Sequence, residues 1–296
     1  MYDTILVPTD GSEHAVQAAE HGLALARLFD ATVHVLTVVD VDGATGPFDE
    51  ADADEDLVTH LEAAGEDAIE SVEAVATDAD RLQTDVVTGE PAESILEYTA
   101  SHDVDLVAMG THGRTGLDRY VTGSVTEHVV RHADVPVLSV RAGSHAAPGE
   151  YDNVLIPTDG SEYASVAIDH GLAIAERADA RVHAVNVVDL GDLAASPSLT
   201  TPTELASRFE SAGEDATEVI AGRARAAGLD VSTEVREGVP AKDLMQYADG
   251  NDVDLIAMGT HGRTGLSRYL LGSTTERIIR HADMPVLAVN AQPADD

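Results

Sequence analysis

The chain has 296 residues, which is enough for one large domain or two of ordinary size. It contains no cysteine, which excludes disulfides, thiol nucleophiles and cysteine metal sites. Its 54 acidic residues outnumber its 17 Lys and Arg residues, so the net charge is −37. Aromatic residues make up only 3% of the chain, so the core must be built from Val, Ile, Leu and Ala.

The acidic residues are spread among periodic apolar segments, which does not fit an acidic binding tail or a disordered protein. Such a charge destabilises a compact fold at low salt, and it is screened near 1 M salt, where the Debye length is roughly 3 Å. The composition therefore favours a halophilic protein over one with a basic partner. No general basic face for binding nucleic acid can be built from these residues.

The amino-terminal stretch MYDTILVPTDG lacks the basic region and the uninterrupted apolar region of a signal peptide. No window of the sequence approaches 18 apolar residues, so neither a membrane span nor a membrane partner is expected. These patterns predict a soluble cytoplasmic protein.

Short β-branched runs alternate with longer amphipathic stretches in the first half of the chain. This alternation predicts strands at 4–7, 32–39, 82–87, 105–109 and 137–140, and helices near 13–29, 53–77, 91–101 and 124–133. Such an order is typical of an α/β fold with a parallel, doubly wound sheet that is covered on both faces. Ligands of these sheets bind beyond the carboxyl ends of the strands, where the strand order reverses.

The second half of the chain repeats the first. ILVPTDGSEHA near the amino terminus is matched by VLIPTDGSEYA 149 residues later, and VDLVAMGTHGRTGL is matched by VDLIAMGTHGRTGL at the same offset. A small, polar stretch, RAGSHAAPGE, lies between the halves. We therefore expect two tandem five-stranded domains, residues 1–142 and 151–296, joined by a linker at 143–150.

Each half carries one glycine-rich loop with local positive charge, GTHGRTGLDRYVTGSVTE at Gly110–Glu127 and GTHGRTGLSRYLLGSTTE at Gly259–Glu276. The G-x2-G-x9-G-S frame leads from an apolar strand to an amphipathic helix. Glycine lets the backbone approach an anion closely, and the N–H groups of a helix N-terminus bind phosphate. Arg114 and Arg119 can add charge at the loop rim. The loop matches neither common nucleotide-binding glycine motif, so an ordinary connection with Ser124 as N-cap is left open.

The glycine frame, downstream of a first strand that ends in P-T-D-x-S, resembles the universal stress protein family, of the tandem, ATP-binding kind. The resemblance covers nearly the whole chain. It implies an adenine nucleotide alpha hydrolase-like fold with strand order 3-2-1-4-5 in each half. It also implies antiparallel pairing of the last strands, Val137–Val140 and Val286–Val289, as a pseudo-dimer within one chain. A further homodimer is left open.

The resemblance also implies one adenine nucleotide site per half. An aspartate after the first strand would hold the ribose, a valine at the end of the second would meet the adenine through its backbone, and the glycine frame would cradle the phosphates. With neighbouring loop residues, the first site consists of Pro8, Thr9, Asp10, Val38, Met109, Gly110, His112, Gly113, Arg114, Gly123, Ser124 and Val125. The second site consists of Pro157, Thr158, Asp159, Val187, Met258, Gly259, His261, Gly262, Arg263, Gly272, Ser273 and Thr274.

Several of these residues have a second interpretation. Asp10 and Glu13 also fit a helix N-cap with a capping box. His112 is interpreted as a polar loop residue or as a hydrogen-bond donor to phosphate. Arg114 stands where the family often has lysine, and its guanidinium can bridge two oxygens. Thr274 replaces Val125, which a backbone contact would tolerate.

Three functions are compatible with this sequence. The first is an ATP-binding stress-response protein that has a signalling or protective role with little or no turnover. The second is a slow ATPase or a nucleotidyl-transfer enzyme, which would need a positioned base, and His112 with Asp10 is the only pair that suggests one. The third is a structural or chaperone-like interaction module. No protein metal site is predicted, and a Mg²⁺ ion would be held mainly through the phosphates of ATP.

Overall fold

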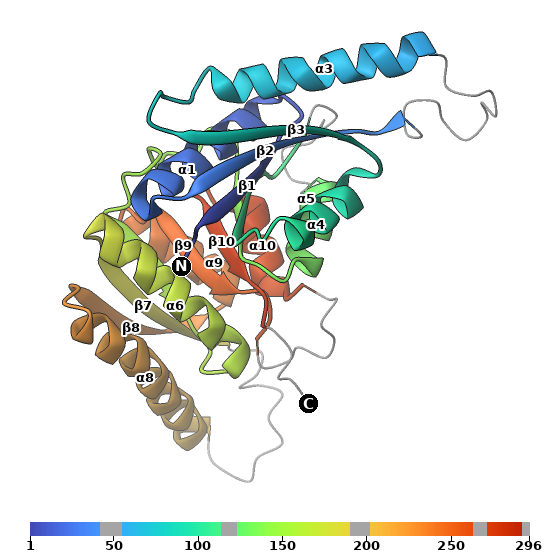
Figure 1. The fold of residues 1–296 in the computed structure, drawn as a ribbon. Helices are drawn as coiled ribbons and strands as arrows, with labels where there is room; N and C mark the ends of the chain where they lie inside the picture. The colour runs from blue at the N-terminus through green and yellow to red at the C-terminus, as the bar shows by residue number, and fades with distance from the viewer. Residues whose placement is uncertain (42–54, 114–122, 190–201, 263–270, 292–296) are drawn as a thin grey trace. The chain divides into compact units, whose positions relative to one another are not determined.

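The computed structural model describes residues 1–41, 55–113, 123–189, 202–262 and 271–291. The chain divides into two compact units, residues 1–144 and 145–296. Each unit is an α/β fold with parallel strands, as the sequence predicts (Figure 1).

The first unit contains a five-stranded sheet in the order β3-β2-β1-β4-β5, which confirms the expected strand order. Its strands are β1 (Thr4–Pro8), β2 (Thr32–Val39), β3 (Arg81–Thr88), β4 (Leu106–Gly110) and β5 (Val137–Val140). Its helices are α1 (Glu13–Phe29), α3 (Glu55–Glu73), α4 (Pro91–Ser101) and α5 (Ser124–His132). Helix α1 packs on the central strands and contacts α3, whereas α4 contacts α5, so the sheet is covered on both faces.

The second unit repeats this architecture in the order β8-β7-β6-β9-β10. Its strands are β6 (Asn153–Pro157), β7 (Arg181–Asp189), β8 (Val231–Gly238), β9 (Leu255–Gly259) and β10 (Val286–Val289). Its helices are α6 (Glu162–Ala178), α8 (Pro202–Ala226), α9 (Pro240–Gly250) and α10 (Ser273–His281). In both units the order along the chain reverses between the first and fourth strands, β1 and β4 or β6 and β9, which pair directly.

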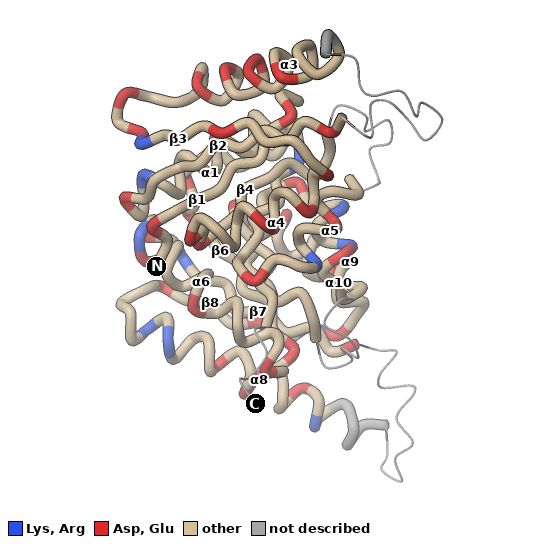
Figure 2. The backbone as a smooth tube through the Cα atoms, turned by 45° about the vertical axis from the view of Figure 1, so that its right-hand side comes forward, with Lys and Arg blue, Asp and Glu red and all other residues tan. Residues whose placement is uncertain are grey.

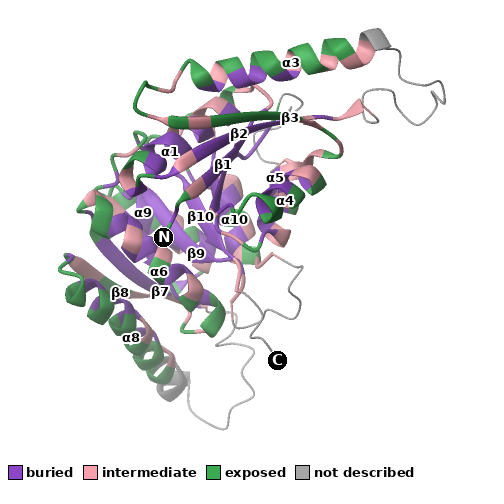
Figure 3. Ribbon diagram, in the orientation of Figure 1, coloured by how far each residue is buried: buried purple, intermediate pink, exposed green. Residues whose placement is uncertain are grey.

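The core of each unit is mainly aliphatic, as the low aromatic content requires, although Tyr2 and Tyr151 are also fully buried. Strands β4 and β9 are buried along their whole length, whereas the edge strand β3 is largely exposed (Figure 3). Buried and exposed side chains do not alternate along β4 and β9, because helices cover both faces of a central parallel strand. Asp and Glu residues are distributed along both units (Figure 2). Across the described parts of the chain, no helix is long and apolar enough to cross a membrane.

The predicted linker, residues 143–150, makes contacts within both units. The backbone N–H of Gly143 donates to Oε1 of Gln17 at 2.9 Å. The backbone N–H of His145 donates to the main-chain oxygen of Asp283 at 3.0 Å, and His145 Nε2 lies 3.3 Å from the main-chain oxygen of Val253. Near the start of this small, polar stretch, Gly143 is therefore bonded to the first unit and His145 to the second.

Candidate ligand-binding site

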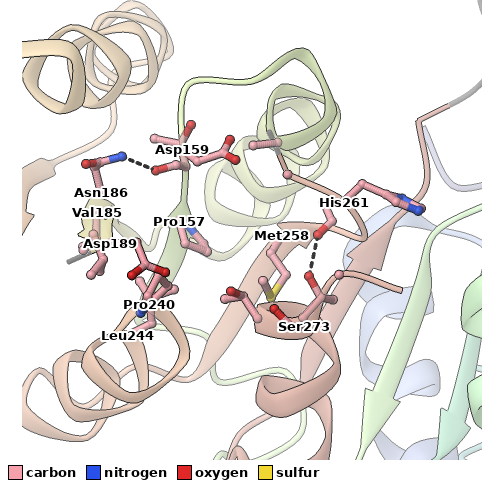
Figure 4. A pocket seen from close by; sticks show the side chains of 18 of the residues that line it. Pro157, Asp159, Val185, Asn186, Asp189, Pro240, Leu244, Met258, His261 and Ser273 are labelled. Carbon is pink, nitrogen blue, oxygen red and sulfur yellow. Dashed lines mark hydrogen bonds between the residues drawn. The ribbon is translucent and has the colours of Figure 1, made fainter. Parts of the chain in front are cut away.

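A cavity of about 220 Å³ opens in the second unit at the carboxyl ends of β6, β7 and β9 (Figure 4). It lies beside the β6–β9 pair, at the point where the strand order reverses. This is the position where doubly wound sheets bind their ligands.

The cavity brings together the residues that the sequence singles out in the second half, as far as the structure describes them. They are Pro157, Thr158, Asp159, Val187, Met258, Gly259, His261, Gly262, Gly272, Ser273 and Thr274. Arg263 and its counterpart Arg114, together with Arg119, lie outside the described residues.

The first unit places its candidate residues on the matching elements. Pro8 ends β1 and is followed by Thr9 and Asp10, while Val38 lies near the end of β2. Met109 and Gly110 end β4, and His112 and Gly113 follow them. Gly123 is the N-cap of α5, and Ser124 and Val125 are the first residues of that helix.

The aspartate after the first strand forms a tight turn rather than a helix cap. Asp10 Oδ1 accepts a hydrogen bond from the backbone N–H of Ser12 at 3.0 Å. The cap of α1 is Ser12, whose Oγ accepts from the backbone N–H of Ala15 at 3.3 Å. The interpretation of Asp10 as the N-cap is therefore wrong, because the chain needs one more turn, through Gly11 at φ 74°, before the helix begins.

The second unit repeats this turn with an additional bond. Asp159 Oδ1 accepts from the backbone N–H of Ser161 at 2.9 Å and from its hydroxyl at 2.6 Å. Ser161 caps α6, and Gly160 has a φ of 79°. The turn directs the carboxylate toward the cavity that Asp159 lines.

The glycine frame passes close to this carboxylate. A Cβ atom on Gly113 would lie 2.5 Å from Asp10 Oδ2, and one on Gly262 would lie 2.6 Å from Asp159 Oδ2. At both distances a side chain on the glycine would force the carboxylate to move. The aspartate and the second glycine of the frame are therefore neighbours in each unit, although about 100 residues separate them in the sequence.

The first glycine of the frame is also fixed by close packing. A Cβ atom on Gly110 would lie 2.7 Å from the main-chain carbon of His14, in the first turn of α1. Gly259 packs in the same way against the main-chain oxygen of Tyr163. These contacts set the end of the fourth strand of each unit directly against the start of its first helix.

A backbone hydrogen bond closes each loop at its base. The N–H of Gly123 donates to the oxygen of Thr111 at 2.7 Å, and the N–H of Gly272 donates to the oxygen of Thr260 at 2.8 Å. The residue after the fourth strand and the N-cap glycine of the next helix are therefore held together in each unit.

The third glycine of the frame is the N-cap of α5 or α10, and neither helix has a side-chain cap. The alternative in which Ser124 caps the helix is therefore wrong, since Ser124 is already helical. Because Gly123 has no side chain, it leaves the first-turn N–H groups of α5 to water or a ligand. This arrangement suits an anion, which the helix dipole also favours.

A buried hydroxyl ties the helix to the strand at each site. Thr126 Oγ1 donates to the main-chain oxygen of Gly110 at 2.7 Å, and Thr275 Oγ1 donates to that of Gly259 at 2.9 Å. Both threonines are 3% exposed. They fix the distance between the end of the strand and the uncapped helix.

The histidine of each loop lies against its preceding threonine. His112 Nδ1 is 3.0 Å from Thr111 Oγ1, and in the second unit His261 Nδ1 is 2.9 Å from Thr260 Oγ1. Nε2 of His112 is buried and has no hydrogen-bond partner among the residues that the structure describes.

The two units differ beside this histidine. The ring of His14 lies 5.1 Å from that of His112, whereas the second unit has Tyr163, whose ring centroid is 6.1 Å from that of His261. The pKa of His14 is lowered mainly by burial and, to a smaller extent, by the charge of the nearby His112. The first unit thus brings two imidazoles together where the second has an imidazole and a phenol.

Several cavity residues were missed from the sequence, among them Asn186, Phe209, Pro240, Leu244 and Thr275. Pro240 carried a usable signal, because proline favours the first turn of a helix and α9 begins at this residue. Phe209 reaches the cavity from α8, and no local pattern distinguishes it from the other apolar residues of that helix.

Comparisons with known proteins agree with this architecture. The family model described as "Universal stress protein family" matches residues 1–141 and again residues 150–290. Universal stress protein MJ0531 of Methanocaldococcus jannaschii is 39% identical over 139 residues, which cover 47% of this chain and 82% of that protein. A universal stress protein of Mycolicibacterium smegmatis is 29% identical over 299 residues, which cover 96% of each chain.

Among solved structures, the crystal structure of a universal stress protein from Archaeoglobus fulgidus has a TM-score of 0.71 and 22% identity. The match covers 99% of this chain and 97% of that one, so the two proteins share the tandem fold.

Proposed function

Since the chain belongs to the universal stress protein family, we propose that it binds adenine nucleotides, ATP in particular, at one site in each half. It acts in a stress response as a signalling or protective protein with little or no turnover. The observation that carries this proposal is the meeting of Asp159, the glycine frame and the uncapped start of α10 around one cavity.

Each part of the cavity has the chemistry for one part of the nucleotide. The carboxylate of Asp159 accepts hydrogen bonds from ribose hydroxyls. The backbone of Val187, with the apolar side chains of Met258 and Leu244, suits the adenine ring. The first-turn N–H groups of α10 suit the phosphates.

The first half supports a matching site. Asp10, Gly113 and the glycine-capped α5 stand in the same relation to one another as their counterparts in the second half. His112 adds a buried imidazole nitrogen that can donate to a phosphate oxygen when it carries a proton.

A Mg²⁺ ion fits this proposal only when the phosphates hold it. The parts of the chain that the structure describes contain no group of three His, Asp or Glu side chains arranged to bind a metal. Mg²⁺ keeps several waters and is bound in many nucleotide sites mainly by phosphate oxygens.

The proposal is tested by purifying the full chain in high salt, denaturing it and identifying the released small molecules by mass spectrometry. We expect about two ATP molecules per chain, one for each glycine frame. ADP or AMP alone would favour a slow ATPase. If no nucleotide is released and none binds on titration, the proposal fails and the function belongs to the protein surface.

A further inference from the structure

In each unit, a side chain from the second strand donates a hydrogen bond to an equivalent main-chain oxygen. This oxygen belongs to the residue before the aspartate that is proposed to bind the ribose. In the first unit, Thr37 Oγ1 donates to the oxygen of Thr9 at 3.1 Å. In the second unit, Asn186 Nδ2 donates to the oxygen of Thr158 at 2.7 Å (Figure 4). Thr37 and Asn186 are 5% and 4% exposed. We propose that they are positioning residues, each of which orients the aspartate that follows the bonded peptide.

This inference rests on the proposed function. Its first support is the point at which the hydrogen-bonded pairing between the first two strands of each unit ends. The pairing of β1 with β2 runs to Pro8 and Leu36, and that of β6 with β7 runs to Pro157 and Val185. The next carbonyl, that of Thr9 or Thr158, lies beyond the paired register. A buried carbonyl without a partner costs free energy, so the side chain of β2 or β7 supplies the bond that the ladder does not.

The bonded oxygen belongs to the peptide group that leads into the aspartate. On one side of Asp159, the bond from Asn186 fixes the plane of that peptide. On the other side, the bonds from Ser161 fix Oδ1 of the carboxylate. A side chain at position 262 would displace this carboxylate, because a Cβ atom there would lie 2.6 Å from Oδ2.

The two halves form this bond with different residue types, which suggests that the bond itself is what matters. Each side chain lies under a glycine of the covering helix. A Cβ atom on Gly65 of α3 would lie 3.2 Å from Thr37 Cγ2, and one on Gly213 of α8 would lie 2.5 Å from Asn186 Oδ1. Because a glycine leaves space at both places, the two residue types can be exchanged between the halves.

The exchange provides the matched control for the test. The first variant of the chain, Thr37→Ala with Asn186→Ala, removes both hydrogen-bond donors. The second variant, Thr37→Asn with Asn186→Thr, keeps a donor at each position but gives it the residue type of the other half. A Thr99→Val variant removes a buried hydroxyl that donates to the oxygen of Ile95 at 2.7 Å within α4. All proteins are titrated in high salt with ATP, 2′-deoxy-ATP and 3′-deoxy-ATP, and their unfolding midpoints are measured.

We expect the parent chain to bind ATP more tightly than at least one deoxy analogue. The double alanine variant should bind ATP about tenfold more weakly and lose most of this ribose preference. The exchanged variant should keep both the affinity and the preference. Thr99→Val should lower only the unfolding midpoint. If the double alanine variant does not fold, Asn186→Ala alone is used, with the unchanged first half as the reference.

Four results would overturn the inference. Equal weakening toward ATP and both deoxy analogues would show a general structural role, and failure of the exchanged variant to restore binding would show that the bond is not the cause. A parent that binds ATP without ribose preference would reject the inference and leave the proposed function standing. A parent that binds no adenine nucleotide would reject both.

Discussion

Gly262 lies so close to Asp159 that a Cβ atom on the glycine would be 2.6 Å from Oδ2 of the carboxylate. This contact joins the turn after β6 to the loop after β9, so that a carboxylate and a glycine backbone face the same cavity. Gly113 and Asp10 repeat it in the first unit, at 2.5 Å.

Replacing Gly113 and Gly262 by Ala should displace the two aspartates. The new methyl groups would occupy the space of Oδ2, so each carboxylate must rotate and weaken its bond to Ser12 or Ser161. We expect ATP to bind at least about tenfold more weakly, or by ~1.4 kcal/mol, as measured by calorimetric titration.

The matched control for this pair is Gly222→Ala. Gly222 lies within α8, and nothing lies within 4 Å of an added Cβ. This variant should be more stable by about 0.5–1 kcal/mol and should bind ATP like the parent. An unchanged ATP affinity in the Gly113 and Gly262 variant would show that the two aspartates do not contribute to ATP binding.

A bulkier change at the third glycine should abolish binding. In the double variant Gly123→Val with Gly272→Val, the branched side chains would lie over the first-turn N–H groups of α5 and α10. A Cβ atom alone would already lie 3.2 Å and 3.0 Å from the oxygens of Thr111 and Thr260. We expect this variant to bind no ATP although its circular dichroism spectrum remains that of the parent. An ATP affinity equal to that of the parent would contradict the assignment of these helix starts to the phosphates.

Thr275→Val should weaken the binding of the phosphates more than the binding of adenosine. The variant loses the bond to the oxygen of Gly259, which sets the strand end against the helix. We expect ATP affinity in the second half to fall about fivefold, or by ~1 kcal/mol, with a smaller effect on adenosine. Titrations with both ligands decide this, and an equal loss for the two would place Thr275 in the fold rather than in the phosphate contact.

Acidification should destabilise the fold through His21. Burial lowers the pKa of His21 to about 4, whereas an unfolded histidine titrates near 6.5. Between these values the unfolded chain binds more protons, so the contribution of His21 is fully present above pH 6.5 and is lost as the pH falls toward 4. The loss can reach about 3 kcal/mol.

Denaturant unfolding between pH 7 and pH 4 at fixed high salt measures this effect. His21→Gln should flatten the pH dependence of the unfolding free energy, while Gln at the exposed His60 should not. Part of the slope should remain, because burial also lowers the pKa of His34, His170 and His183. The same slope in both glutamine variants would be incompatible with this account.

The net charge of −37 should make stability depend on salt. Below about 0.5 M salt, screening weakens and the carboxylates repel one another over longer distances. We expect the thermal unfolding midpoint to fall steadily as KCl is reduced from 2 M to 0.2 M. A midpoint that does not change across this range would reject the interpretation of the composition as an adaptation to salt.

Much of the fold could be predicted because local signals agree with tertiary packing. Strand β2 and helix α4 have the bounds expected from their β-branched run and from the proline at the start of the helix. The expected helix at 53–77 instead ends at Glu73. Asp80 Oδ2 accepts from the backbone N–H of Thr77 at 2.8 Å and is paired with Arg27, and a bond to a residue about 50 positions away leaves no local signal.

The candidate site could be predicted only in part, for the same reason. The glycine frame is visible in the sequence because it recurs in both halves, and Asp159 is visible because it begins a local turn with the glycine and serine that follow it. Asn186 and Thr275 were missed because their roles depend on carbonyl groups that only the folded chain brings near. The difference between His14 and Tyr163 was visible, but its location beside the loop histidine was not.

Calorimetric titration of ATP into the nucleotide-free 296-residue chain in high salt measures directly whether each half binds one nucleotide. We expect one ATP to bind per half of the chain, and binding in one half to be lost when only Gly123 or only Gly272 is changed to Val. Absence of any heat of binding for ATP, adenosine and AMP alike would contradict the proposed nucleotide sites.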